Sequence, residues 1–136
     1  MNTSYLVRGV LAWMLIAVAE TLHGVARGQF LRPIVGDLAS RQIGVFTGSA
    51  MILIIAWLVI RWIGAVTRSE LLAVGAVWLL LMLSFEVALG RALGASWKRI
   101  VSDYDFRQGG LMLVGMAVLF LSPLIAARLR GGGARQ

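Results

Sequence analysis

The sequence contains no cysteine, only two prolines and few charged residues, which make up 14% of its 136 positions. Without cysteine, the chain has no disulfide, thiolate metal ligand or cysteine nucleophile. Soluble domains are about one quarter charged and about one half apolar. Here 60% of the residues are hydrophobic and the mean hydropathy is +0.87. This balance argues against a water-soluble globule, and the length is that of one domain, residues 1–136.

The charged residues divide the chain into four apolar segments of nearly equal length. The segments contain 18, 19, 20 and 20 residues, and they are 9–26, 42–60, 71–90 and 108–127. A helix needs about 20 residues, at 1.5 Å each, to cross a hydrocarbon core about 30 Å thick. Lipid admits only helices and closed barrels, and these segments are too long for barrel strands. The sequence therefore predicts an all-α integral membrane protein with four transmembrane helices.

The connections between these segments differ in length. The short one between the second and third segments contains Thr67 and Glu70, whose spacing predicts a capping box at the start of the third helix. The two longer connections, 28–40 and 94–106, are each expected to hold a short interfacial helix or a re-entrant segment. The glycine-rich end, 131–136, is expected to be a flexible tail.

The first segment has a second interpretation, as a cleavable leader. Arg8 precedes an apolar stretch that ends in Ala17 and Ala19, a pattern typical of a signal peptide. The internal duplication described next favours a membrane helix, because it makes the residues after Ala19 a continuation of that helix.

An internal duplication relates the two halves of the chain. A shift of 66 positions aligns residues 20–44 with 86–110 without a gap and gives 10 identities in 25 positions, among them Glu20 with Glu86. Ordinary composition would give about two or three identities. We therefore predict two tandem helix–loop–helix repeats. These repeats span about 5–62 and about 68–130.

The predicted repeats have consequences for symmetry and orientation. Each repeat crosses the membrane twice, so both insert in the same orientation and are expected to be related by a pseudo-twofold axis along the membrane normal. The positive-inside rule hardly discriminates, because six Lys and Arg residues lie on the side of the termini and seven on the side of the long loops. We expect a bacterial inner (cytoplasmic) membrane and cytoplasmic termini, because the basic loop residues have acidic neighbours.

A small-residue pattern follows each glutamate of the duplication. Two glycines occur four and eight positions after each, so each set lies on one helix face. Small residues four apart allow helix backbones to approach closely in lipid. We interpret this GxxxG pattern as the packing contact between the first and third helices, which would bring the two glutamates together near the axis. The glycines are Gly24, Gly28, Gly90 and Gly94.

The two glutamates are the main candidates for function. Glu20 lies about 10 Å along the helix from Arg27, well inside hydrocarbon depth. A carboxylate at the bilayer centre costs about 2.5–3.5 kcal/mol on insertion scales unless it is paired, protonated or in contact with water. An ionisable residue inside a membrane is therefore a functional hypothesis by default. The candidate ion or solute ligands are Glu20, Glu86 and His23.

Three explanations for these glutamates remain open. In the first, each glutamate pairs with a basic side chain and is structural; the available partners are Arg27, Arg41, Arg107 and His23. In the second, two close carboxylates share a proton or a cation during transport. In the third, they hold the cationic part of a ligand.

A second polar cluster lies at the starts of the second and fourth segments, where Ser40 and Asp105 are expected N-caps. Helix N-termini with basic side chains nearby can bind an anion such as a lipid phosphate. The candidate anion or lipid-headgroup ligands are Arg32, Arg41, Gln42, Lys98, Arg107 and Gln108. Asp37 and Asp103 each precede an arginine of this set by four positions, so an interfacial salt-bridge network is the alternative.

No catalytic or metal-binding pattern accompanies these clusters. The sequence has no phosphate-binding glycine loop, no serine nucleophile motif and no metal-ligand spacing. We therefore expect no enzymatic activity, no cofactor and no metal, and we expect membrane lipids rather than nucleic acid as partners.

The leading functional hypothesis is a small transporter or channel for an ion or small solute that uses the paired intramembrane glutamates. Four helices make a narrow bundle, so we expect a homodimer or larger homo-oligomer to complete the pathway. The alternative is a non-catalytic membrane assembly, lipid-binding or accessory subunit of a larger complex. A lipid-modifying enzyme working at the basic loop face is a third reading.

Overall fold

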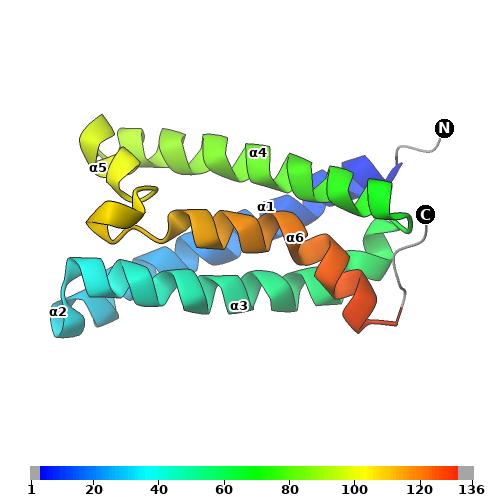
Figure 1. Cartoon of the computed structure of the whole chain (residues 1–136), viewed down its shortest axis with the longest axis horizontal. Coiled ribbons are helices and arrows are strands. Elements are labelled where there is room, and N and C mark those ends of the chain that lie inside the picture. Colours follow the sequence, from blue (N-terminus) through cyan, green and yellow to red (C-terminus); the bar gives the residue numbers. More distant parts are fainter. Residues whose placement is uncertain (1–3, 132–136) are drawn as a thin grey trace.

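Four long helices account for most of the computed structural model, which describes residues 4–131 (Figure 1). They are α1 (Ser4–Ala26), α3 (Asp37–Ile63), α4 (Arg68–Ala92) and α6 (Met112–Leu129). All four are long and apolar enough to cross a membrane, α1 together with the short helical segments that continue it. The described residues contain no strand. The predicted all-α fold with four helices of membrane-spanning length is confirmed. Most of the predicted tail, 132–136, lies outside the described residues.

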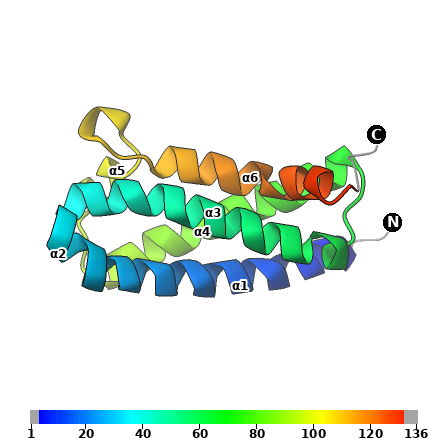
Figure 2. The ribbon, with the colours of Figure 1, turned by 90° about the horizontal axis from the view of Figure 1, so that it is seen from below.

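The four helices form a bundle in which each has two neighbours. Helix α1 packs against α3 and α4, and α6 packs against the same two helices. Helices α1 and α6 are therefore diagonally opposite, as are α3 and α4 (Figures 1 and 2). The start of α1, the end of α6 and the α3–α4 turn lie together at what we call the turn end. The two longer connections lie together at the opposite, loop end, as expected.

This order of neighbours is not the one that the predicted pseudo-twofold axis requires. A twofold axis along a four-helix bundle exchanges helices that lie across the axis from one another. If it exchanged α1 with α4 and α3 with α6, at least one of these two pairs would lie on opposite corners of the bundle. In the structure both pairs are in contact along an edge. The packing therefore does not display the pseudo-twofold relation, and the tandem repeat stays a prediction from the sequence.

The two long connections also differ from one another. In the first, α1 continues through a π-helical turn, η1 (Arg27–Leu31), into α2 (Arg32–Val35), where Pro33 occupies the first turn and does not break the helix. Gly36 then reverses the chain with a φ of 91°, a conformation that a residue with a Cβ rarely adopts. The second connection holds α5 (Trp97–Ser102) and the 3-10 turn η2 (Phe106–Gln108).

The predicted caps have different outcomes. Thr67 and Glu70 form the expected capping box: the Glu70 N–H donates to Thr67 Oγ1 at 3.1 Å, and the Thr67 N–H donates to Glu70 Oε1 at 3.1 Å. Ser40 is not an N-cap, because α3 begins earlier, directly after Gly36, and Ser40 is buried inside it. Asp105 caps η2 and not the last long helix.

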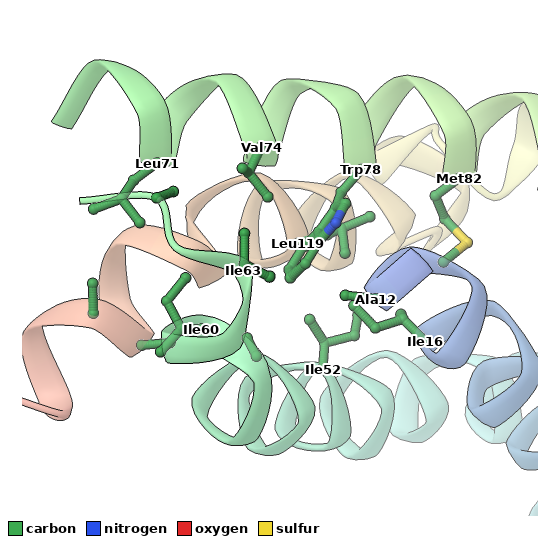
Figure 3. Packing of buried hydrophobic residues seen from close by; sticks show 14 of the residues in the cluster. Ala12, Ile16, Ile52, Ile60, Ile63, Leu71, Val74, Trp78, Met82 and Leu119 are labelled. Atoms are coloured by element: carbon green, nitrogen blue, oxygen red, sulfur yellow. The ribbon is translucent and has the colours of Figure 1, made fainter. Parts of the chain in front are cut away.

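The hydrophobic core lies mainly towards the turn end (Figure 3). Its largest member, Trp78 of α4, is completely buried, and its Nε1–H donates to the carbonyl oxygen of Gly9 in α1 at 2.7 Å. In lipid, helices associate through close packing and such interhelical hydrogen bonds. The other fully buried apolar side chains come from all four long helices and include Ile16, Ile63, Leu71, Val74 and Leu119. The turn end is thus closed by dense packing.

The closest helix approach uses a glycine that the sequence analysis did not single out. A Cβ at Gly75 of α4 would collide with the carbonyl oxygen of Phe120 in α6. The predicted packing glycines do not have this role: a Cβ at Gly24, Gly28 or Gly94 would meet nothing within 4 Å, and one at Gly90 would meet only Ile100 of α5, at 3.4 Å. The interpretation of these four glycines as the contact between α1 and α4 is wrong. Those helices meet nearer the turn end, at Gly9 and Trp78.

Alanine substitution should separate these two kinds of glycine. Gly75→Ala forces α4 away from α6 because the obstructing atom is backbone, and we expect it to lower the free energy of unfolding by about 1–3 kcal/mol, the usual cost of overpacking. Gly24→Ala is the control and should leave stability unchanged or slightly higher, since alanine favours helix. Thermal unfolding in detergent measures both. Equal stability of Gly75→Ala and the wild type would contradict the close approach.

Candidate functional site

Both predicted intramembrane glutamates line one cavity inside the bundle. The cavity has a volume of about 640 Å³ and lies in the loop-end half, with all four long helices contributing to its wall. Glu20 reaches it from α1 and Glu86 from α4. Ile52, Met82 and Leu119 belong both to the cavity wall and to the core, so the core forms the floor of the cavity.

Two glycines of α3 make room for charged side chains of α1 and η1. A Cβ at Gly48 would lie 3.0 Å from Glu20 Oε2 and 3.2 Å from Oε1. One helical turn earlier, a Cβ at Gly44 would lie 2.6 Å from Cδ of Arg27. The Glu20 and Arg27 side chains therefore lie directly against the backbone of α3. Gly44 and Gly48 have the same four-residue spacing as the glycines considered above, so that pattern could have identified them.

Glu20 is largely enclosed but incompletely hydrogen-bonded. Its side chain is 18% exposed, and its Oε1 is buried with no hydrogen-bond partner among the described residues. Buried acceptors usually have partners, so an unpaired one has to be explained. Ser49 Oγ, on the same cavity wall, is likewise buried and unpaired. Acceptor capacity thus remains unused beside the cavity.

His23 also lines the cavity, next to Glu20. Its Nε2 lies 2.6 Å from Thr47 Oγ1, and its Nδ1 lies 3.8 Å from Glu20 Oε2, too far for a hydrogen bond. The Thr47 hydroxyl lies 3.3 Å from the carbonyl oxygens of Ile43 and Gly44, to which it can donate. The hydroxyl oxygen then accepts from Nε2–H of His23. This hydrogen bond fastens α1 to α3 beside the carboxylate.

Arg27 is the charged side chain that both glutamates share. It acts electrostatically on Glu20 and on Glu86, and the two glutamates act on one another. None of the three forms an ion pair with another of the three within 4 Å in the part of the chain that the structure describes. Neither glutamate therefore pairs directly with an arginine. Of the structural explanation, only the contact of Glu20 with His23 at 3.8 Å is present, and it is an ion pair when the imidazole is protonated.

At the loop end, two arginines and two aspartates form a network of ion pairs, which we call the rim network: Arg41, Arg99, Asp37 and Asp103. Arg41 donates from Nε to Asp37 at 3.1 Å and also pairs with Asp103. Arg99 Nη1 lies 3.0 Å from both carboxylate oxygens of Asp103, and its Nη2 lies 3.7 Å from Asp37. The network links the start of α3 to α5 and the turn that follows it.

The six residues expected to bind an anion are not brought together. Arg41 and Gln42 line the cavity, and Gln42 Nε2 donates to the carbonyl oxygen of Gly109 at 2.9 Å. The other four are exposed and outside the cavity wall; they are Arg32, Lys98, Arg107 and Gln108. Arg107 is 92% exposed and pairs only with Asp105, at 3.4 Å. Asp37 does pair with Arg41, as the salt-bridge alternative predicted, whereas Asp103 pairs with Arg41 and Arg99 instead of Arg107.

Tyr104 and Asp105 lie in the turn that follows α5, and their pKa values are shifted in opposite directions. Burial, with the negative charges of Glu86 and Asp103, raises the pKa of Tyr104 to about 12. Its hydroxyl is buried and has no hydrogen-bond partner among the residues described. Hydrogen bonds from the Gln108 side chain and the Arg107 backbone lower the pKa of Asp105. Nothing in the sequence around Tyr104 indicated that this side chain lies near Glu86.

Comparisons of the chain with protein families, with curated proteins and with solved structures find no match. Its class is therefore defined by its own architecture. Four helices long and apolar enough to cross a membrane indicate a polytopic membrane protein. Function has to be inferred from the cavity.

The position of Tyr104 can be checked by titration. The chain has two tyrosines, so the difference in tyrosinate absorbance between the wild type and Tyr104→Phe isolates this residue. We expect a midpoint at about pH 12, because burial and the nearby carboxylates oppose the phenolate. A midpoint near the ordinary value of 10 would show that Tyr104 faces bulk water.

Proposed function

We propose that this protein is a small membrane transporter or channel for an ion or small solute, with its binding site in the cavity between Glu20 and Glu86. The observation that carries the proposal is that these two carboxylates, from two different helices, line one cavity in the interior of the bundle. Ionisable residues that face a cavity inside a membrane protein commonly mark substrate or ion pathways.

The size of the cavity supports this role. A volume of 640 Å³ is many times the roughly 30 Å³ that one water occupies in the liquid, so the cavity has room for several waters. Water in the cavity would reduce the cost of carboxylates at this depth, and a cation could replace part of that water. A purely structural pair of glutamates would need neither the volume nor the unpaired oxygen of Glu20.

The distribution of packing supports a site with access from one end. The densely packed core closes the turn end, whereas the cavity extends to Arg41, Arg99 and Asp103 of the rim network. Opening of the rim network would widen the access to the cavity at the loop end. Passage through the turn end would require the core helices to separate, which is the kind of rearrangement that alternating access involves.

One chain is sufficient to form the proposed site, because all four of its long helices line the cavity. A homodimer or larger assembly, expected from the narrowness of a four-helix bundle, is therefore proposed for stability or regulation rather than to complete the site. The tandem repeat would explain why a glutamate occurs at equivalent positions of α1 and α4.

We further propose a bacterial inner membrane with the termini in the cytoplasm. At the turn end, Arg8, Arg61 and Arg130 hydrogen-bond to backbone carbonyl oxygens and not to carboxylates. At the loop end, Arg41 and Arg99 are paired with aspartates. The lack of carboxylate partners for these three turn-end arginines carries this orientation, because the Lys and Arg counts alone hardly discriminate.

Neutralising the glutamates tests the function. In proteoliposomes we expect Glu20→Gln and Glu86→Gln each to lower the flux of the transported solute at least about tenfold, which corresponds to about 1.4 kcal/mol of interaction free energy. Protons, potassium and small amines are the solutes to be screened. Circular dichroism and gel filtration establish that the variants are folded.

The third glutamate of the chain provides a matched control. Glu70 lies outside the cavity and caps α4, a role that glutamine also fills. Glu70→Gln should therefore keep wild-type flux. Undiminished flux in the double variant of Glu20 and Glu86 would rule the proposal out.

The alternative function is an accessory, lipid-binding or assembly subunit of a larger membrane complex. The close fit of Glu20 against Gly48 favours it, since that contact also joins α1 to α3. In that case the glutamine variants should lose thermal stability or a co-purifying partner, and the purified wild type should transport nothing.

A further inference from the structure

The charge, size and wall chemistry of the cavity together define a ligand class. We infer that the site takes a small organic monocation that has an apolar body and N–H donors, such as a primary alkylammonium ion. This inference rests on the proposed function, because it names the solute for the same site.

The rim network is electrically balanced. It contains the cations Arg41 and Arg99 and the anions Asp37 and Asp103, each within 4 Å of a charge of opposite sign. These four side chains therefore neutralise one another and leave no net charge for a ligand to balance.

The interior of the cavity is not balanced. Its remaining charged side chains are Glu20, Glu86 and the single cation Arg27. His23, which donates to Thr47, contributes no charge when neutral, and the Tyr104 phenol stays protonated because its pKa is about 12. With both carboxylates ionised and His23 neutral, the two carboxylates and the one guanidinium leave one negative charge in a region of low polarity. One monovalent cation restores neutrality, and at low pH a proton can take its place.

The wall of the cavity favours an organic cation over an inorganic one. Below the charged groups the wall is apolar, with Ile52, Met82, Met116 and Leu119. An alkyl chain gains free energy by leaving water for such a surface, whereas a metal ion does not. Among residues 4–131, no group of three His, Asp or Glu side chains could hold a metal ion. The volume of about 640 Å³ also far exceeds that of a bare ion.

The polar groups of the wall favour an ammonium ion with hydrogens on nitrogen. No aromatic side chain lines the cavity, so it offers no aromatic face for a quaternary ammonium. Glu20 Oε1 and Ser49 Oγ are both unpaired acceptors. A primary ammonium has three N–H donors, and hydrogen bonds from a charged donor to a carboxylate are among the strongest in proteins.

Calorimetric titration of the purified full-length protein in detergent tests this inference. The probes are hexylammonium, its quaternary analogue hexyltrimethylammonium, neutral hexanol, hexanoate and potassium chloride. We expect hexylammonium to bind most tightly and at least about tenfold more tightly than hexanol, a difference of about 1.4 kcal/mol. Glu20→Gln and Glu86→Gln should remove this preference, and Glu70→Gln should retain it. Because all variants share the same detergent, partitioning of the probe into micelles cancels.

A second variant covers the case in which a glutamine substitution disturbs folding. Glu86→Asp keeps the negative charge, and it should retain the preference for hexylammonium over hexanol even if it weakens binding. Binding of hexylammonium no tighter than that of hexanol, or a preference that survives in folded Glu20→Gln and Glu86→Gln, would overturn the inference.

Flux measurements separate this inference from the proposed function. Glu86-dependent flux of potassium or protons in proteoliposomes, with no binding of hexylammonium, would leave the transport proposal standing and overturn the organic-cation inference. Glu86-dependent binding of hexylammonium without flux of any probe would support the ligand class and overturn transport. Glu86-dependent uptake of hexylammonium would support both.

Discussion

The structure depends on how two carboxylates are accommodated at a depth where ionised groups are expensive. An apolar bundle would either exclude Glu20 and Glu86 or force them to stay uncharged. Here the bundle surrounds them with a cavity and places Arg27 within electrostatic reach of both. The single positive charge of Arg27 reduces the free-energy cost of the two buried carboxylates but does not remove it. The remaining imbalance is the basis on which we propose the cavity as a cation site.

The two ends of the bundle are held together by different kinds of contact. At the turn end, Trp78 bonds to α1 and Gly75 allows α4 and α6 to touch, so the helices are held by close packing. At the loop end, the rim network and the bond from Gln42 to Gly109 hold the elements together, and these are partly exposed polar contacts. Such contacts are worth less than dense packing and compete with water. The loop end is therefore the half in which opening costs least.

The sequence analysis predicted the site better than it predicted the contacts around it. Glu20 and Glu86 were identified because each lies inside an apolar segment and because the two align in the internal duplication. A charged residue within an apolar segment can be recognised without any structure. The packing role of Gly24 and Gly90 was wrong, since a small residue marks only where a close approach is possible. The glycines that admit charged side chains, Gly44 and Gly48, carry the same pattern on the neighbouring helix. Likewise, Asp103 pairs with Arg41 across space and with Arg99 four residues before it, and not with Arg107 four residues after it.

By itself, the sequence determined the number and length of the helices, the capping box of α4 and the side of the bundle on which each connection lies. These features follow from hydropathy, backbone hydrogen bonding and chain continuity, which are local. The tertiary structure alone decided which helices are neighbours, that both glutamates line one cavity, and that the arginines of the rim are already paired. Neighbour order depends on how whole helix surfaces fit together, and charge balance depends on distances between residues far apart in the chain, so neither can be read from residue spacing.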